Sequence, residues 1–161
     1  MNESVELAGG SKAERYSELL PQLASLVKGE PDLIANLANI TAALRVCLPV
    51  ASWIGFYVMR AGELVLGPFQ GKVACVRIAV GRGVCGTAAA ERRTVIVPDV
   101  DQFPGHIACD AGSKSEIVVP IVVGDRLVAV LDLDSYDLAA FDEVDADHLA
   151  KIAALAATFA W

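Results

Sequence analysis

The N-terminal third of the chain carries apolar residues with the spacing of helices. Within residues 16–27 they recur every three or four positions, at Tyr16, Leu19, Leu20, Leu23 and Val27. Pro21 lacks a backbone N–H donor, so it either kinks this helix or marks its start. A second helix is predicted from about Asp32 to Val46, because its apolar residues form one face, and Pro49 ends it.

From residue 53 the apolar residues begin to alternate with a period of two, which is typical of strands. Six strands are predicted, at Trp53–Arg60, Glu63–Phe69, Cys75–Val80, Thr94–Val97, Glu116–Val123 and Arg126–Asp134. Ala61-Gly62 and Gly124-Asp125 form hairpin turns, and a short helix at Gly83–Arg93 separates the first three strands from the rest. A long loop spans Asp99–Lys114, and a last helix starts at an Asp142 cap. This order of elements predicts an α+β domain, an antiparallel six-stranded sheet flanked by helices.

The length of 161 residues fits one domain. Residues 1–10 are rich in small and polar types and are predicted to be a flexible tail, so the folded domain spans 11–161. The net charge of −7, with only 13 Lys and Arg, argues against nucleic acid or an anionic membrane as partner. We find no secretory signal and no membrane-length apolar stretch, so we expect a cytoplasmic protein whose thiols stay reduced.

The four cysteines occupy different sequence contexts. Cys47 lies in an apolar helix end and is predicted to be a core residue. Cys109 follows the turn Pro104-Gly105-His106, an exposed setting that favours a functional thiol. Cys85 stands at a helix start, where the dipole stabilises a thiolate, but packing between glycines is an equal alternative. Cys75 falls in a predicted strand, which taken alone favours a core position.

Two carboxylates share one face of the last strand. Asp132 and Asp134 are two positions apart, so their side chains point the same way, together with Val128 and away from Leu127. The strand is otherwise apolar on both faces. Burial of two carboxylates there is costly, so we expect a cationic group to bind between them.

Three other kinds of site are disfavoured. Zinc would have to use Cys75, Cys85, Cys109 and His106, and these lack the C-x-x-C spacing of structural sites, so no metal is predicted. No nucleophile elbow accompanies His106, which weakens a Ser-His-Asp hydrolase. Gly81-Arg82-Gly83 lacks the Lys-Ser/Thr pair that a phosphate loop needs.

Several segments together resemble a known family. They are residues 64–71, Cys75, and residues 81–88, 97–100, 103–110, 115–120 and 131–135. Both their short sequence motifs and the spacing of their three cysteines closely resemble those of the free methionine-(R)-sulfoxide reductases, which are single GAF domains. The resemblance covers about residues 12–160.

The resemblance implies a role for eight residues. Cys109 is the nucleophile, Cys75 the resolving cysteine and Cys85 an auxiliary thiol, while Glu116, Asp132 and Asp134 hold and protonate the substrate, and Trp53 and Tyr57 line its pocket. It also implies a homodimer, a preference for the R sulfoxide and no cofactor. The residues themselves leave open whether Cys75 or Cys85 is the main resolving cysteine.

This chemistry is consistent with the residue types. A thiolate attacks the sulfoxide sulfur while a carboxyl group protonates the oxygen, and the resulting sulfenic acid condenses with a second thiol to a disulfide that thioredoxin can reduce. The aspartate pair favours a free amino acid, because a methionine within a polypeptide has no α-ammonium group. The alternatives are a sensory GAF module that binds a small ligand and a thiol redox sensor, and the latter has no use for the aspartates.

Overall fold

A computed structural model of the protein describes residues 3–161. The first helix, α1, spans Lys12–Leu26 and begins at a capping box, in which the Ser11 side chain accepts from the Glu14 N–H and the Glu14 carboxylate accepts from the Ser11 N–H. Pro21 lies inside α1 and therefore does not mark its start.

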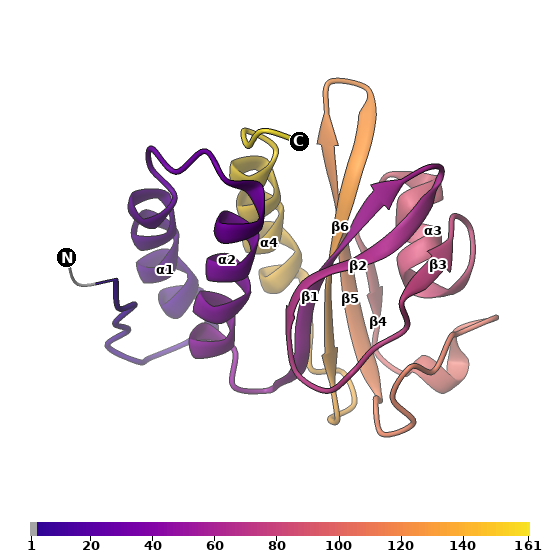
Figure 1. The fold of residues 1–161 in the computed structure, drawn as a ribbon. Helices are drawn as coiled ribbons and strands as arrows, with labels where there is room; N and C mark the ends of the chain where they lie inside the picture. Colours follow the sequence, from indigo (N-terminus) through magenta and orange to yellow (C-terminus); the bar gives the residue numbers. More distant parts are fainter. Residues whose placement is uncertain (1–2) are drawn as a thin grey trace.

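Two further helices pack beside α1. α2 spans Leu33–Cys47 behind an Asp32 cap, and α4 spans Glu143–Ala156 behind the predicted Asp142 cap. Together the three helices cover one face of the sheet (Figure 1). No helix in the part of the chain that the structure describes combines the length and the apolar character needed to cross a membrane.

The predicted tail has no helix or strand in its described part, residues 3–10, while residues 1–2 lie outside the described part of the chain. Its backbone nevertheless contacts α1. The Glu6 N–H donates to Gln22 and the Ala8 N–H donates to Glu18.

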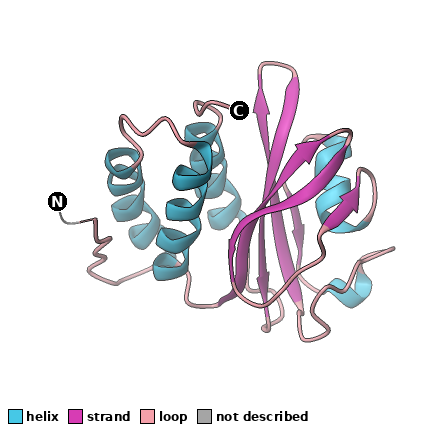
Figure 2. Cartoon of the chain, in the orientation of Figure 1, coloured by secondary structure: helices cyan, strands magenta, loops and turns pink. Residues whose placement is uncertain are grey.

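The sheet has six antiparallel strands, as predicted (Figure 2). They are β1 Ala51–Arg60, β2 Glu63–Gln70, β3 Arg77–Ala79, β4 Val95–Val97, β5 Ser115–Val123 and β6 Arg126–Ser135. Their spatial order is β3-β2-β1-β6-β5-β4, so the central strands β1 and β6 come from opposite halves of the chain. A short helix, α3, spans Gly83–Glu91, and a 3₁₀ turn, η1, spans Val100–Gln102 within the predicted long loop.

The prediction of a strand at Cys75–Val80 is wrong at its start, because β3 begins only at Arg77. Before β3 the Val76 carbonyl still accepts from the Leu66 N–H of β2, but two earlier carbonyls accept from side chains of β1. The Trp53 indole N–H donates to the carbonyl of Lys72 at 3.0 Å, and the Tyr57 hydroxyl donates to the carbonyl of Cys75 at 2.9 Å. Cys75 therefore lies in a loop, half-buried, and is not a strand residue of the core.

The expected orientation of Val128 and Leu127 is also wrong. Along β5 and β6, Ile121 pairs with Ala129 but the next residue, Val122, pairs with Leu127, so Val128 has no partner and forms a β-bulge. On the N-terminal side of the bulge, the side chains of β6 point to the faces opposite to those that simple alternation predicts. Val128 therefore packs with the helix-side core, and Leu127 packs against the opposite one.

Each face of the sheet has its own apolar core. The larger core lies between the sheet and α1, α2 and α4, and Cys47 is completely buried in it, as predicted. A buried carboxylate joins two of these helices, since Asp145 of α4 accepts from the Tyr16 hydroxyl at 2.8 Å and from the Lys12 ammonium at 2.6 Å. The smaller core lies on the other face, under α3, and the polar residues discussed below lie on this face.

Candidate active site

The pairing of the central strands brings three carboxyl groups together. Asp134 of β6 is flanked by Trp53 of β1 on one side and Glu116 of β5 on the other. Asp132, two residues earlier, lies opposite Gly55 on β1. Asp132 and Asp134 share a face of β6, as predicted from the period of a strand, and together with Glu116 they point toward α3.

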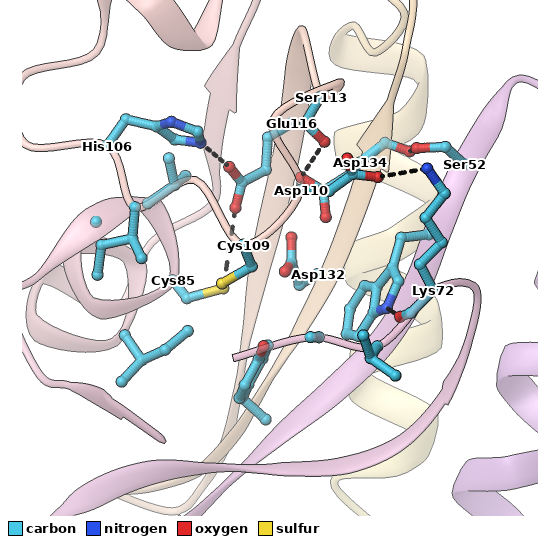
Figure 3. Close-up of a pocket in the computed structure, with 18 of the residues that line it drawn as sticks. Ser52, Lys72, Cys85, His106, Cys109, Asp110, Ser113, Glu116, Asp132 and Asp134 are labelled. Carbon is cyan, nitrogen blue, oxygen red and sulfur yellow. Dashed lines mark hydrogen bonds and ion pairs between the residues drawn. The ribbon is translucent and has the colours of Figure 1, made fainter. Parts of the chain in front are cut away.

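These side chains line a pocket between the sheet, α3 and two loops, residues 71–76 and 103–114 (Figure 3). The pocket encloses about 600 Å³, including its opening to solvent. Seven of the eight residues singled out from the sequence line it: Trp53, Tyr57, Cys85, Cys109, Glu116, Asp132 and Asp134. Aromatic stacking builds one wall, where the ring centroid of Trp53 lies 5.3 Å from that of Phe69 and 5.9 Å from that of Tyr57.

The three carboxyl groups retain their protons more strongly than ordinary carboxyls do. Burial raises the pKa of Glu116, Asp132 and Asp134 well above the usual range, and repulsion among the three raises these pKa values further. The Ser113 hydroxyl donates to Asp134 at 3.3 Å and partly opposes the shift. The Oδ1 atom of Asp132 is buried and accepts no hydrogen bond from the described residues, so the site presents an unused acceptor.

His106 adds a neighbour to this group that the sequence did not connect with it. Its Nε2 lies 3.5 Å from the Oε2 of Glu116. Burial lowers the pKa of His106, although Asp101 acts in the opposite direction, and the pKa of Glu116 is raised. Both shifts favour the uncharged forms of the two groups. The loop length, the turn before Cys109 and the resemblance of residues 103–110 all pointed to this segment, but none of them paired His106 with Glu116.

Cys85 is a buried, protonated thiol. It lies in the first turn of α3, and its Sγ is 3.9 Å from the Oε1 of Glu116. Burial raises the pKa of Cys85 well above that of an ordinary thiol, and the nearby carboxyls, led by Asp132, raise this pKa further. These effects outweigh the expected stabilisation of a thiolate by the helix dipole.

One set of potential metal ligands occurs among the described residues. Donor atoms of Cys85, Glu116 and Asp132 lie within 4.8 Å of one another. This set differs from the four ligands weighed in the sequence, because Cys75 and Cys109 are bonded to each other. Within the set the Cys85 Sγ contacts the Glu116 Oε1 at 3.9 Å, and burial raises the pKa of all three groups.

Cys75 and Cys109 form a disulfide between the two loops. Their Cα atoms are 5.5 Å apart, although 34 positions separate them in the sequence. Cys109 is exposed and lines the pocket, as its sequence context suggested, and Cys75 is half-buried. The two aromatic side chains that line the pocket, Trp53 and Tyr57, also anchor the loop of Cys75 through its carbonyl groups.

A second contact joins the same two loops. The Lys72 ammonium lies 3.5 Å from the Asp110 carboxylate, which also accepts from the Tyr136 hydroxyl at 2.6 Å. The ammonium lies 5.2 Å from the centre of the Tyr136 ring. The Tyr136 hydrogen bond, the Gly112 N–H and Lys72 lower the pKa of Asp110, so the carboxylate is charged. Sequence reasoning missed this group, which we call the Lys72–Asp110–Tyr136 clasp.

Known proteins resemble this chain over nearly its full length. Residues 32–159 match the GAF domain family. "GAF domain-containing protein A" of Dictyostelium discoideum is 53% identical, covering 94% of this chain and 96% of that protein. "Free methionine-R-sulfoxide reductase" of Escherichia coli is 48% identical, covering 89% of this chain and 87% of the enzyme.

A solved structure agrees with the fold as well. It is the free methionine-R-sulfoxide reductase of Neisseria meningitidis in complex with its substrate, which is 47% identical and superposes with a TM-score of 0.94. The match covers 97% of this chain and 94% of that chain. The chain therefore belongs to the GAF domain family, in the group that contains the free methionine-R-sulfoxide reductases.

Proposed function

We propose that this protein reduces free methionine-(R)-sulfoxide to methionine, with Cys109 as nucleophile, Cys75 as resolving cysteine and thioredoxin as reductant. One observation carries the proposal. Cys109, bonded to Cys75, lines the same pocket as three buried carboxyl groups. A thiol supplies the electrons that the sulfoxide needs, and a protonated carboxyl supplies the proton that its oxygen needs.

In the first step the Cys109 thiolate attacks the sulfur of the sulfoxide. This attack forms an S–S adduct that then breaks down. Its oxygen passes to the Cys109 sulfur as a sulfenic acid, the S–S bond and the S–O bond to the substrate sulfur both break, and methionine leaves as the reduced thioether. Glu116 is the proposed acid. Burial raises its pKa, which favours the protonated form that can act as an acid, and the His106 imidazole beside it can relay a proton to it.

In the second step the Cys75 thiol attacks the sulfenic acid. An S–S bond forms, the S–O bond breaks and the oxygen leaves as water. Two properties favour Cys75 over Cys85 in this step. Cys75 lies within bonding distance of Cys109, whereas Cys85 is 4% exposed and its raised pKa keeps it a thiol, which is a poor nucleophile. Thioredoxin then returns both cysteines to thiols by disulfide exchange, in a reducing compartment such as the cytoplasm.

Asp132 and Asp134 are the proposed binding site for the α-ammonium group of the substrate. The unused Oδ1 acceptor of Asp132 is buried in the pocket, where a bound ammonium could donate to it. The positive charge would favour ionisation of the aspartates and offset the cost of their burial. Trp53 and Tyr57 would contact the apolar part of the substrate.

The test is a coupled assay with thioredoxin, thioredoxin reductase and NADPH. Free methionine-R-sulfoxide should drive NADPH consumption, and the S epimer and hydrogen peroxide should not. Consumption with peroxide alone would favour a thiol redox sensor or peroxidase, and the proposal would fail. Sedimentation of the same preparation tests the homodimer that we expect from the resemblance.

A further inference from the structure

Apolar side chains are exposed around the disulfide. Eight large apolar residues in the described part of the chain are exposed, and half of them lie in the segments beside the two bonded cysteines. These four, which we call the apolar rim, are Val73, Val76, Val80 and Ile107. Val73 is 88% exposed and Val76 is 62% exposed, which is much for valines in a chain that buries two cores.

The apolar rim draws its residues from both loops that carry the bonded cysteines. Val73 and Val76 flank Cys75 in sequence, and Ile107 lies two positions before Cys109. The disulfide brings these segments to a Cα separation of 5.5 Å. Ile107 also packs closely on Gly83, since a Cβ atom at Gly83 would lie only 3.1 Å from the Ile107 side chain. Gly83 begins α3, just after the turn that contains Val80.

Charged side chains surround the apolar rim. Lys72, Arg77 and Arg82 lie in the same segments of a chain whose net charge is −7. Lys72 and Arg77 each pair with one carboxylate, whereas Arg82 makes no ion pair within residues 3–161. The paired carboxylates offset Lys72 and Arg77, and Asp101 acts on His106 in the loop of Cys109, so the surface around the disulfide is apolar with charges of both signs at its edge.

We propose that the apolar rim is the docking surface for the dithiol protein, of the thioredoxin class, that reduces the Cys75–Cys109 disulfide. The inference rests on the proposed function. One thiolate of the partner attacks the disulfide and forms a mixed disulfide. Its second thiol then displaces the first, so the partner leaves oxidised and both cysteines of this chain leave as thiols.

The size of the apolar rim suits such a partner. Redox proteins meet transiently through small interfaces, at the low end of the range for protein complexes. A few exposed valines beside the reacting sulfurs can hold the partner long enough for exchange and still release it. A small dithiol such as dithiothreitol needs no such surface, and this difference supplies the test.

The test compares Val76→Asp with the wild type under two reductants. Val76 is exposed and does not line the pocket. The KM for thioredoxin should rise about tenfold, equivalent to about 1.4 kcal/mol, while turnover with dithiothreitol and the first-turnover yield of methionine stay at the wild-type level. Ile34→Asp is the matched control. Ile34 is 56% exposed on α2, which lies on the opposite face of the sheet from α3 (Figure 1), and the KM of this variant for thioredoxin should not change.

Three outcomes would overturn the inference. One is an unchanged KM for thioredoxin in both Val76→Asp and Val80→Asp. Another is a tenfold rise in Ile34→Asp as well, which would mean a general charge effect. The third is conversion of a wild-type dimer to monomers by Val76→Asp, which would assign the apolar rim to the contact between subunits. Failure of the proposed function would look different, since the wild type would then release no methionine even with dithiothreitol.

Discussion

Two loop cysteines with different surroundings are assigned different steps of the proposed reaction. Cys109 lines the pocket, beside the carboxyl groups that can supply protons. Cys75 does not line it, and the Tyr57 hydroxyl holds its backbone. The two thiols are thus distinguished by what lies next to each of them, and each should respond differently to substitution.

We expect Cys109→Ser to abolish even one turnover of free methionine-R-sulfoxide, because a hydroxyl is a far poorer nucleophile near neutral pH. Cys75→Ser should release one equivalent of methionine and then stall with thioredoxin. Rapid-quench measurement of methionine per enzyme checks both results, and dimedone should label the accumulated sulfenic acid on Cys109. Cys47→Ser, in the core on the far side of the sheet, is the control. A full equivalent of methionine from Cys109→Ser would identify another thiol as nucleophile.

Loss of either aspartate should lower activity only with substrates that carry a positively charged α-ammonium group. A hydrogen bond to a charged group contributes about 1.5 to 3 kcal/mol, so Asp132→Asn or Asp134→Asn should lower kcat/KM by about tenfold to over a hundredfold. N-acetylmethionine-R-sulfoxide lacks the ammonium group. The wild type should already reduce it poorly, and the Asn variants should lose little more. Equal turnover of the free and acetylated substrates by the wild type would contradict recognition of the ammonium.

At the scale of elements, rigid strands position the loops that carry the thiols. β1 does this directly, since Trp53 and Tyr57 point into the pocket and donate to carbonyls of the loop 71–76. The loop of Cys109 is held by the Ser113 hydrogen bond to Asp134 and by the clasp. The clasp does not depend on the disulfide, so we expect it to keep the two loops close after reduction.

Tyr136→Phe removes the hydroxyl that orients Asp110 and should slow the condensation of the Cys109 sulfenic acid with Cys75. Exposed charge pairs contribute up to about 1 kcal/mol, so we expect about a two- to fivefold lower rate of disulfide formation. The first-turnover yield of methionine should not change. Stopped labelling with dimedone after one turnover measures the lifetime of the sulfenic acid.

Arg93→Met provides the control for the clasp, because it removes an exposed ion pair with Glu91 on another part of the surface. High salt should slow disulfide formation in both the wild type and Tyr136→Phe, because the Lys72–Asp110 ion pair remains in the variant. A sulfenic acid lifetime that is the same in wild type and Tyr136→Phe would exclude a role for the clasp in resolution.

At the scale of the whole molecule, the two faces of the sheet differ in what they bury. The larger core, under three helices, is apolar apart from a few satisfied groups such as Asp145. The smaller core surrounds three carboxyls with raised pKa values. The stability that the larger core provides therefore offsets the cost of burying three carboxyl groups in the smaller one. This cost should appear in the pH dependence of unfolding.

Stability should fall as the pH rises from mildly acidic to alkaline. The folded carboxyls have raised pKa values, so above the ordinary carboxyl pKa of about 4 the folded state retains protons that the unfolded chain has lost. Each such group lowers the free energy of unfolding by about 1.4 kcal/mol per pH unit until its folded pKa is passed. Urea unfolding of the oxidised protein, measured from pH 5 to 9 in steps of roughly one pH unit, gives the free energy of unfolding at each pH and checks this decline.

Asp132→Asn removes one of these protons and should make the slope of stability against pH shallower, with a gain in stability at alkaline pH and a loss of activity. Asp147→Asn, at an exposed position of α4, should leave the slope unchanged. A wild-type slope in Asp132→Asn would mean that this carboxyl is ionised in the folded protein.

Features that depend on near neighbours in the chain could be read from the sequence. The helices, the six strands and the burial of Cys47 follow from the spacing of apolar residues. The common face of Asp132 and Asp134 follows from the two-residue period of a strand. The resemblance to known reductases also indicated which residues share a pocket, although spacing alone could not place them there.

Contacts between distant segments could not be read in this way. The Cys75–Cys109 bond, the His106–Glu116 pair and the clasp each depend on the spatial order of the strands. Cys75 lies in a loop and not in its predicted strand, because the Tyr57 side chain of β1 donates to its carbonyl. Val128 lies on the face opposite to the predicted one because of a single β-bulge. Periodicity reports the local backbone, whereas these features follow from the lowest free energy of the whole packed chain, in which residues far apart in sequence compete for the same partners.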